Sequence, residues 1–420
     1  MRKPLIVVTG VDPTAMQATM ASLVWALPDV VAIRHVIEPI TQQLSRFVSS
    51  MHGSEDTATV DLQHACVGCA VREDILPTIH RLAQEPEWKT IVACLPVSAE
   101  ADHLCATIAR DPQVSRYVRL ASVISTVPGE GAVDHLLDSD WLGESGLQTG
   151  PGDPRSVGEA ACAQVEYADL IVSMGAISDV DGDFISALMR PTAEFVPGIE
   201  NIDVEALTSG RHSSREAHAW RNPRSEYKLP NLGESRAWRI DLSSTRPFHP
   251  ERLVDEIQGL SGRFRSRGCF WVPTRPSMAN TWEGVDGQVS IGQHSEWDPD
   301  TPLTRLILTG VGCAPNGVHT IFGNLLLSNA ELQREPGTWL TSEDGLEPVA
   351  RRHPLRRIEG AQHGSSQASD VSKPDTTPTI PVEGGSAHPR SRHRARDHLP
   401  GASSTRRRRE AWSRFSRQLG

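Results

Sequence analysis

The sequence lacks any run of apolar residues long enough to cross a membrane. Its 420 residues are 38% hydrophobic and 22% charged, and no stretch approaches the 18 or more consecutive apolar residues of a transmembrane helix. The first residues also lack the apolar segment and small-residue cleavage site of a secretory signal peptide. We therefore expect no membrane insertion, no export and a cytoplasmic location.

The sequence is also poor in closely spaced cysteines. Its seven cysteines are an odd number, and without an export signal most are expected to be reduced. This excludes a fold built on disulfide bonds. Only Cys66 and Cys69 are spaced so that one turn of chain could bring both thiols to the same bound group. The other five stand alone and are expected to pack as small apolar residues: Cys94, Cys105, Cys162, Cys269 and Cys313.

The net charge of −10 is distributed unevenly along the chain. Residues 351–420 carry 15 Lys and Arg against 6 Asp and Glu, whereas residues 1–350 carry 27 against 46. Residues 350–420 are rich in Ser, Pro, His, Gly and Arg, and too poor in apolar residues to form a core, so we predict a disordered basic tail. Direct nucleic-acid contact is expected only through this tail, because the acidic body repels phosphates.

Alternating apolar strands and amphipathic helices predict an α/β domain over residues 1–202. Residues 5–9 form an apolar run typical of a buried parallel strand, and a helical spacing of apolar residues follows it. Another buried strand is expected at 90–95, and the alternation predicts a doubly wound parallel sheet. Residues 203–236 are polar and lose this periodicity, so we expect a linker there. Strand and helix patterns return in 237–349, which we expect to form a small α+β domain.

The loop after the first strand has the position of a phosphate-binding loop but lacks its residues. Helix N-terminal amides bind phosphates at this point of a parallel sheet, and a complete P-loop adds a lysine and a Ser or Thr for magnesium. Residues 10–19 contain one glycine, no lysine and the acidic Asp12. A simple strand-to-helix turn is therefore the favoured interpretation. If a nucleotide binds, Gly10, Thr14 and Thr19 are expected to contact its phosphates.

Cys66 and Cys69 form the second candidate site. A Cys-x-x-Cys on a glycine-containing turn can place two thiolates on one zinc ion. The motif supplies only two ligands, and the candidates for the others are His64, Glu38 or a distant Cys or His. The same spacing is also compatible with a redox pair or with two buried thiols that bind nothing. Zinc binding is the favoured of these three interpretations.

The C-terminal half carries a long pattern made of residues 246–250, Arg252-Leu253, 265–268, Phe270-Trp271, Thr274-Arg275-Pro276 and Trp282. This pattern resembles the C-terminal domain of CobW-family proteins. The N-terminal half is similar to the GTPase domain of the same family, which is part of the CobW/HypB/UreG class of P-loop metallochaperones. The resemblance covers about residues 4–348 and implies a P-loop fold, zinc binding, and GTP and Mg²⁺ as family cofactors.

The resemblance also shows where the chain departs from the family. The family's Gly-Cys-x-Cys-Cys motif falls on residues 65–69, where the outer two cysteines remain and Gly68 replaces the middle one. The P-loop lysine is absent, and the glutamate expected at the end of the Walker B-like strand falls on Cys94. The guanine-recognition motif falls on residues 174–177 and keeps none of its key residues. These losses argue against a conventional GTPase cycle with GTP and Mg²⁺, and we assign no catalytic residue.

A subgroup of CobW-like proteins with degraded nucleotide motifs and a Cys-x-x-Cys resembles this chain more closely. That subgroup is associated with zinc starvation and with remodelling or hibernation of ribosomes. The resemblance therefore implies a zinc-responsive factor that acts by contact with a protein partner, the ribosome or a ribosome-associated factor. The alternatives are a GTP-hydrolysing zinc metallochaperone with a non-standard nucleotide site and a thiol redox switch at Cys66 and Cys69.

Overall fold

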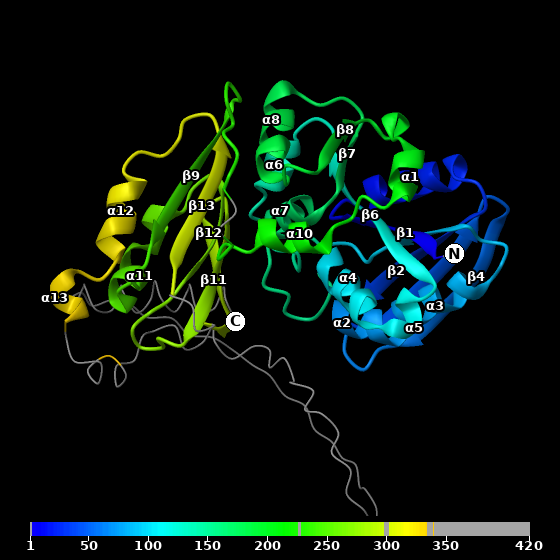
Figure 1. Ribbon diagram of the computed structural model, residues 1–420, viewed down its shortest axis with the longest axis horizontal. Helices are drawn as coiled ribbons and strands as arrows, with labels where there is room; N and C mark the ends of the chain where they lie inside the picture. Colours follow the sequence, from blue (N-terminus) through cyan, green and yellow to red (C-terminus); the bar gives the residue numbers. More distant parts are fainter. Residues whose placement is uncertain (1, 226–227, 298–301, 334–338, 340–420) are drawn as a thin grey trace, which may run out of the picture.

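The computed structural model of the chain describes residues 2–225, 228–297, 302–333 and 339 (Figure 1). The predicted basic tail, 350–420, lies outside the described residues. An N-terminal α/β unit and a C-terminal unit with its own sheet lie side by side. Among the described residues, no helix is both long enough and apolar enough to cross a membrane.

An eight-stranded sheet organises the N-terminal unit, in the order β4-β3-β2-β5-β1-β6-β7-β8. The six strands from β2 to β8 in this order are parallel, and β3 and β4 add an antiparallel hairpin at one edge. This confirms the predicted doubly wound α/β fold. The strands are β1 (Lys3–Gly10), β2 (Val30–Glu38), β3 (Gln43–Ser50), β4 (Gly53–Asp61), β5 (Thr90–Cys94), β6 (Val118–Pro128), β7 (Leu170–Met174) and β8 (Glu194–Pro197).

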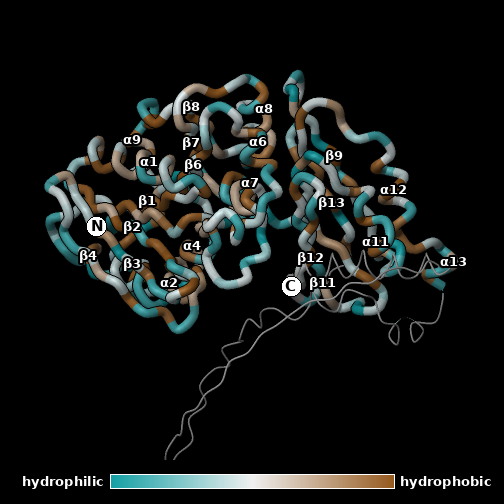
Figure 2. Tube along the Cα trace, turned by 180° about the vertical axis from the view of Figure 1, so that it is seen from behind, coloured by the Kyte–Doolittle hydropathy of each residue, from teal (hydrophilic) through white to brown (hydrophobic). Residues whose placement is uncertain are grey.

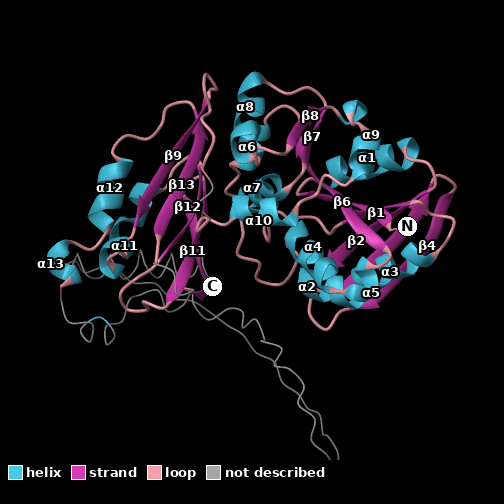
Figure 3. Cartoon of the chain, viewed as in Figure 1, coloured by secondary structure: helices cyan, strands magenta, loops and turns pink. Residues whose placement is uncertain are grey.

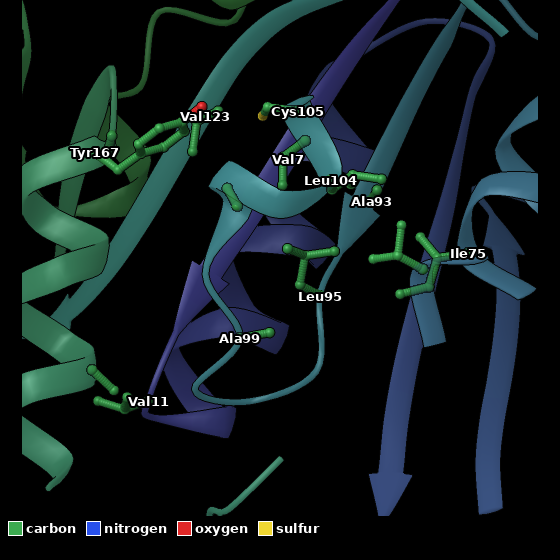
Figure 4. Close-up of a cluster of buried hydrophobic side chains, with 14 of the residues drawn as sticks. Val7, Val11, Ile75, Ala93, Leu95, Ala99, Leu104, Cys105, Val123 and Tyr167 are labelled. Carbon is green, nitrogen blue, oxygen red and sulfur yellow. The ribbon is translucent and has the colours of Figure 1, made fainter. Parts of the chain in front are cut away.

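Helices cover both faces of this sheet because its central strands are apolar on both sides. Along β1, Leu5 and Val7 belong to the core on one face, and Ile6 and Val8 to the core on the other. Figure 4 shows part of the first core, where Leu104 packs near the sheet. Figure 2 shows brown, apolar residues along these central strands. The helices are α1 (Pro13–Ala26), α2 (Val67–Ala70), a π-helical turn (Val71–Ile75), α3 (Leu76–Gln84), α4 (Ala101–Arg110), α5 (Pro112–Ser115), α6 (Ala132–Leu136), α7 (Val157–Tyr167), α8 (Asp179–Leu188) and a 3₁₀ turn (Ile199–Asn201).

The segment 203–236, expected to be a linker, contains two helices, α9 (Val204–Ser209) and α10 (Ser214–Arg221). Both pack on the N-terminal unit. Trp220 is buried, and His212 Nδ1 shares a hydrogen bond of 2.9 Å with the buried Asp169. These partners lie far away in the sequence, so the local polar composition of the segment does not reveal them.

The C-terminal unit is a five-stranded antiparallel sheet, in the order β12-β11-β10-β13-β9, with helices on one face (Figure 3). This confirms the predicted α+β domain. Phe248, Phe270 and Trp282 form the aromatic centre of its core. The elements are β9 (Ala237–Ser244), α11 (Pro250–Glu256), a 3₁₀ turn (Ile257–Leu260), β10 (Arg265–Phe270), β11 (Met278–Val285), β12 (Gln288–Glu296), β13 (Thr304–Val311), α12 (Val318–Leu325) and α13 (Asn329–Leu332).

The two units meet at a buried ionic network. Arg265 on β10 donates from Nε and Nη2 to the carboxylate of Glu166 on α7, at 3.0 and 3.1 Å. Arg265 also pairs with Glu283 on β11, and Arg267 Nε lies 3.5 Å from Glu166 Oε1. Glu166 and both arginines are buried. The two arginines of the Arg-Ser-Arg-Gly pattern in the C-terminal half therefore dock the sheet onto the N-terminal unit.

Candidate functional site

The loop after β1 leads into a helix N-terminus that is already capped by the chain itself. Asp12 Oδ1 accepts hydrogen bonds from the backbone N–H groups of Thr14 and Ala15, at 2.7 and 3.3 Å. Its carbonyl accepts from Met16 at 3.1 Å, and Pro13 has no N–H to offer. An incoming phosphate would have to displace a carboxylate of the same charge from the first helical amides.

The three residues expected to contact phosphates do not form one site. Thr14 is exposed and Thr19 is fully buried. Gly10 is tightly packed, because a Cβ atom there would lie 2.3 Å from Thr126 Oγ1 and 2.7 Å from Met16 Cγ. The buried Met16 stands where the Walker motif has its lysine. This loop therefore does not fit a nucleoside triphosphate held in the conventional way.

The position of the Walker B-type glutamate is equally unsuited to magnesium. Cys94 ends β5 and is buried. Burial raises the pKa of its thiol to about 12, so the side chain stays protonated at neutral pH. Magnesium requires oxygen ligands, carboxylates above all, and Cys94 supplies none.

Cys66 and Cys69 lie together at the start of α2. Cys66 caps the helix, and its Sγ accepts a hydrogen bond from the N–H of Cys69 at 3.0 Å. Both thiols are free, with Cys69 buried and Cys66 partly exposed. Burial, reinforced by the hydrogen bond with Cys66, raises the pKa of the Cys69 thiol, and Arg72, 3.7 Å from its Sγ, opposes this shift. The turn thus presents two sulfur donors side by side.

Cys66 opens onto a cleft of about 1140 Å³. The cleft lies between the cysteine turn, the start of α4 and the loop 149–155. Gly150 brings this loop against the turn, because any Cβ atom at that position would lie 2.3 Å from the Ala65 carbonyl oxygen. His64, one of the ligands proposed from the sequence, is exposed and lines the cleft. Glu38, the other, is exposed at the end of β2, lies outside the lining residues and accepts a hydrogen bond from the N–H of Ile40.

His103, in the first turn of α4, also lines this cleft, and sequence analysis did not single it out. A Cβ atom at Gly68 would lie 3.5 Å from His103 Nε2 and 3.9 Å from Cys66 Sγ. A lone histidine on an amphipathic helix carries no spacing signal that links it to a distant cysteine pair. Within the described ranges, no three His, Cys, Asp or Glu side chains are already close enough together to hold a metal ion.

Ionic contacts connect this cleft to the C-terminal sheet. Arg155, in the cleft wall, lies 2.9 Å from Glu100 and 2.8 Å from Asp153. Glu100 also pairs with Arg221 of α10 at 2.7 Å. The carbonyl of Arg221 in turn accepts a hydrogen bond from Arg267 Nη1 of β10 at 3.1 Å. Burial alone would raise the pKa of Glu100, but the charges of Arg221 and Arg155 hold it below its ordinary value.

Comparison with known proteins shows which proteins this chain is similar to. Residues 238–326 match the family described as the cobalamin synthesis protein cobW C-terminal domain. A zinc chaperone of Mycobacterium tuberculosis (Rv0106) is 28% identical over 316 residues, which cover 71% of this chain and 74% of that protein. The zinc-regulated GTPase metalloprotein activator 1 of Dictyostelium discoideum is 22% identical over 264 residues, covering 58% and 55%.

A solved structure, the Zn(II)-bound YjiA GTPase from E. coli, is 14% identical, with a TM-score of 0.31; the match covers 78% of this chain and 100% of that one. The family match and the two relatives confirm the resemblance to CobW-type proteins that the sequence motifs indicated. The link to the ribosome-associated subgroup stays a prediction.

Proposed function

We propose that this CobW-type chain binds Zn²⁺ as cargo through Cys66 and Cys69 and acts on it by contact with a protein partner. The observation that carries the proposal is the pair of adjacent free thiols at the edge of a cleft that also holds two imidazoles. Thiolate and imidazole are the donors that zinc prefers in proteins. The names of the two relatives, a zinc chaperone and a zinc-regulated GTPase metalloprotein activator, support the same metal.

The chemistry of the cysteine turn suits an exchangeable metal. A structural zinc site is closed by four protein ligands, whereas this turn supplies two sulfurs and leaves the remaining positions to the cleft. Both thiols must lose a proton to bind zinc, so binding releases protons and strengthens as pH rises. Arg72 favours the thiolate of Cys69 by its positive charge.

We further propose that zinc handling in this chain does not depend on a conventional GTPase cycle. The proposal is supported by Asp12, whose carboxylate occupies the helix amides that bind phosphates in P-loop proteins. The alternative is a GTP-hydrolysing zinc metallochaperone with a non-standard site. Calorimetry with GTP and Mg²⁺ separates the two: we expect no binding heat, and micromolar, guanine-selective binding would favour the alternative.

A redox switch is the third candidate, since Cys66 and Cys69 are within hydrogen-bonding contact of each other. It requires a reversible disulfide between them. Mass spectrometry after mild oxidation measures this bond directly, and its absence excludes the switch.

Zinc content tests the cargo proposal. We expect purified wild-type protein to contain zinc and the Cys66→Ser/Cys69→Ser variant to contain none beyond background. Equal zinc content in the two proteins would contradict the proposal.

For the partner, we propose the ribosome or a ribosome-associated factor in the cytoplasm, on the strength of the resemblance to the zinc-starvation subgroup. Sedimentation of ribosomes from zinc-poor and zinc-replete cells tests this proposal. We expect more co-sedimentation when zinc is scarce. Co-sedimentation that is indifferent to zinc would count against the subgroup and leave the metal site untouched.

A further inference from the structure

We propose that His103 is a third protein ligand of the zinc ion held by Cys66 and Cys69, an inference that rests on the zinc function proposed above. His103 Nε2 and Cys66 Sγ both lie within 4 Å of one point, the place where a side chain at residue 68 would begin. Cys69, on the same turn, lies within hydrogen-bonding contact of Cys66. The Cys66 thiol and the His103 imidazole therefore flank the space that Gly68 leaves free, and the second thiol lies on the same turn.

The distances around Gly68 allow a zinc ion to bind between Cys66 and His103 after rotation of the two side chains. Zinc binds a histidine nitrogen at about 2.0–2.1 Å and a cysteine sulfur at about 2.3 Å. The point beside Gly68 lies 3.5 Å from the imidazole nitrogen and 3.9 Å from the sulfur, so these two donor atoms are no farther apart than the sum of the two distances. Rotation about the side-chain torsions of both residues can bring the two donors onto one zinc ion in the adjoining cleft, which both residues line. This explains why the described residues show no preformed group of three ligands.

The imidazole of His103 is available for this role. The hydrogen bonds of His103 within the described part of the chain come from its backbone: its N–H donates to Asp102 Oδ1 at 2.7 Å, and its carbonyl accepts from Thr107 Oγ1 at 2.8 Å. Its side chain is exposed on the first turn of α4. Reorienting the ring toward the cysteines therefore breaks none of these contacts.

The acidic side chains of the same cleft are engaged elsewhere. Glu100 pairs with two arginines, Arg155 and Arg221. Asp102 accepts the His103 N–H and lies 3.9 Å from Arg221. A zinc ion would have to compete with these arginines for the carboxylates, whereas zinc binding to His103 breaks no ion pair. His64 also lines the cleft, but His103 is the imidazole placed beside both Gly68 and Cys66.

The affinity for Zn²⁺, measured by competition with a chromophoric chelator, tests this assignment. Loss of an outer-shell partner of a metal ligand typically costs 10–100-fold in affinity, so we expect His103→Ala to lose about 100-fold or more. His103→Cys restores a zinc donor at the same place and should bind within about 10-fold of wild type. His52→Ala is the matched control, because His52 is exposed on the turn between β3 and β4, outside the cleft; it should bind as wild type does.

X-ray absorption at the zinc edge identifies the donors themselves. We expect two sulfur ligands and an imidazole in the wild type, and loss of the imidazole signal in His103→Ala. If His103→Ala keeps wild-type affinity or the imidazole signal, His103 is not a ligand, and loss of zinc from Cys66→Ser/Cys69→Ser would still support the zinc function. If the wild type itself fails to bind zinc, the proposed function falls together with this inference. Circular dichroism of each variant checks that the exposed substitution leaves the fold intact.

Discussion

Replacing Glu166 by glutamine gives the sharpest prediction for the contact between the two units. Glu166 and Arg265 are each 1% exposed, and Arg267 is 6% exposed. Glu166→Gln keeps the size of the side chain but removes the charge that faces both guanidinium groups. Glu283 is then the acidic partner that remains for Arg265. Removing one partner of a buried ion pair costs about 3–5 kcal/mol, and the retained amide oxygen places this variant near the lower end, at about 3 kcal/mol.

Urea denaturation followed by tryptophan fluorescence measures this loss as a change in the free energy of unfolding. Glu194→Gln serves as the control, because the Glu194 carboxylate is 50% exposed and pairs with Arg211, which is 39% exposed. Exposed pairs contribute roughly 0–1 kcal/mol, so the control should change stability by less than that. If Glu166→Gln costs no more than Glu194→Gln, the argument that the buried arginines depend on Glu166 is refuted.

Three further predictions concern pH, the helix cap and the cleft. Burial raises the pKa of Glu159 to about 7, so its ionisation destabilises the fold as pH rises from about 4.5 through 7. Glu159→Gln should therefore be more stable than wild type by on the order of 1–3 kcal/mol at about pH 8, and as stable as wild type near pH 4.5. Thermal unfolding at the two pH values measures this difference, and an equal gain in stability at both would contradict the reasoning. Asp12→Ala should lose about 1 kcal/mol in chemical denaturation, as expected for a lost N-cap, and should gain no GTP binding in calorimetry. Gly150→Ala should weaken zinc binding in the competition assay by pushing the loop away from the cysteine turn, whereas Gly143→Ala, with open space around it, should not.

The parallel sheet could be predicted because its strands are apolar without interruption. Residues 5–9 and 90–95 fall on β1 and β5, which pair in the centre of the sheet. The hairpin of β3 and β4 was missed, because it lies at the edge and β4 alternates between exposed and half-buried residues with few apolar ones. The two helices of the segment 203–236 were missed for a related reason: their polar sequence hides single buried anchors such as Trp220.

The candidate site shows the same division between local and tertiary signals. The spacing of Cys66 and Cys69 alone predicts that both thiols share one turn, because three residues make less than one turn of helix. The sequence also shows that Asp12 lies in the loop after the first strand, but its hydrogen bonds to the helix amides could be seen only in the structure. His103 lies near Gly68 and Cys66 only through the tertiary position of α4, which no local pattern encodes. The role of the Arg265 motif at the contact between the units was hidden in the same way.

The affinity for Zn²⁺ of three proteins tests the proposed function most directly: the wild type, Cys66→Ser/Cys69→Ser, and Cys313→Ser. Cys313 is an exposed free thiol on the C-terminal unit and therefore controls for non-specific binding to cysteine. We predict that the double variant loses about 100-fold or more in affinity and that Cys313→Ser binds zinc as the wild type does. Equal affinities in the wild type and the double variant would contradict the zinc function of this chain.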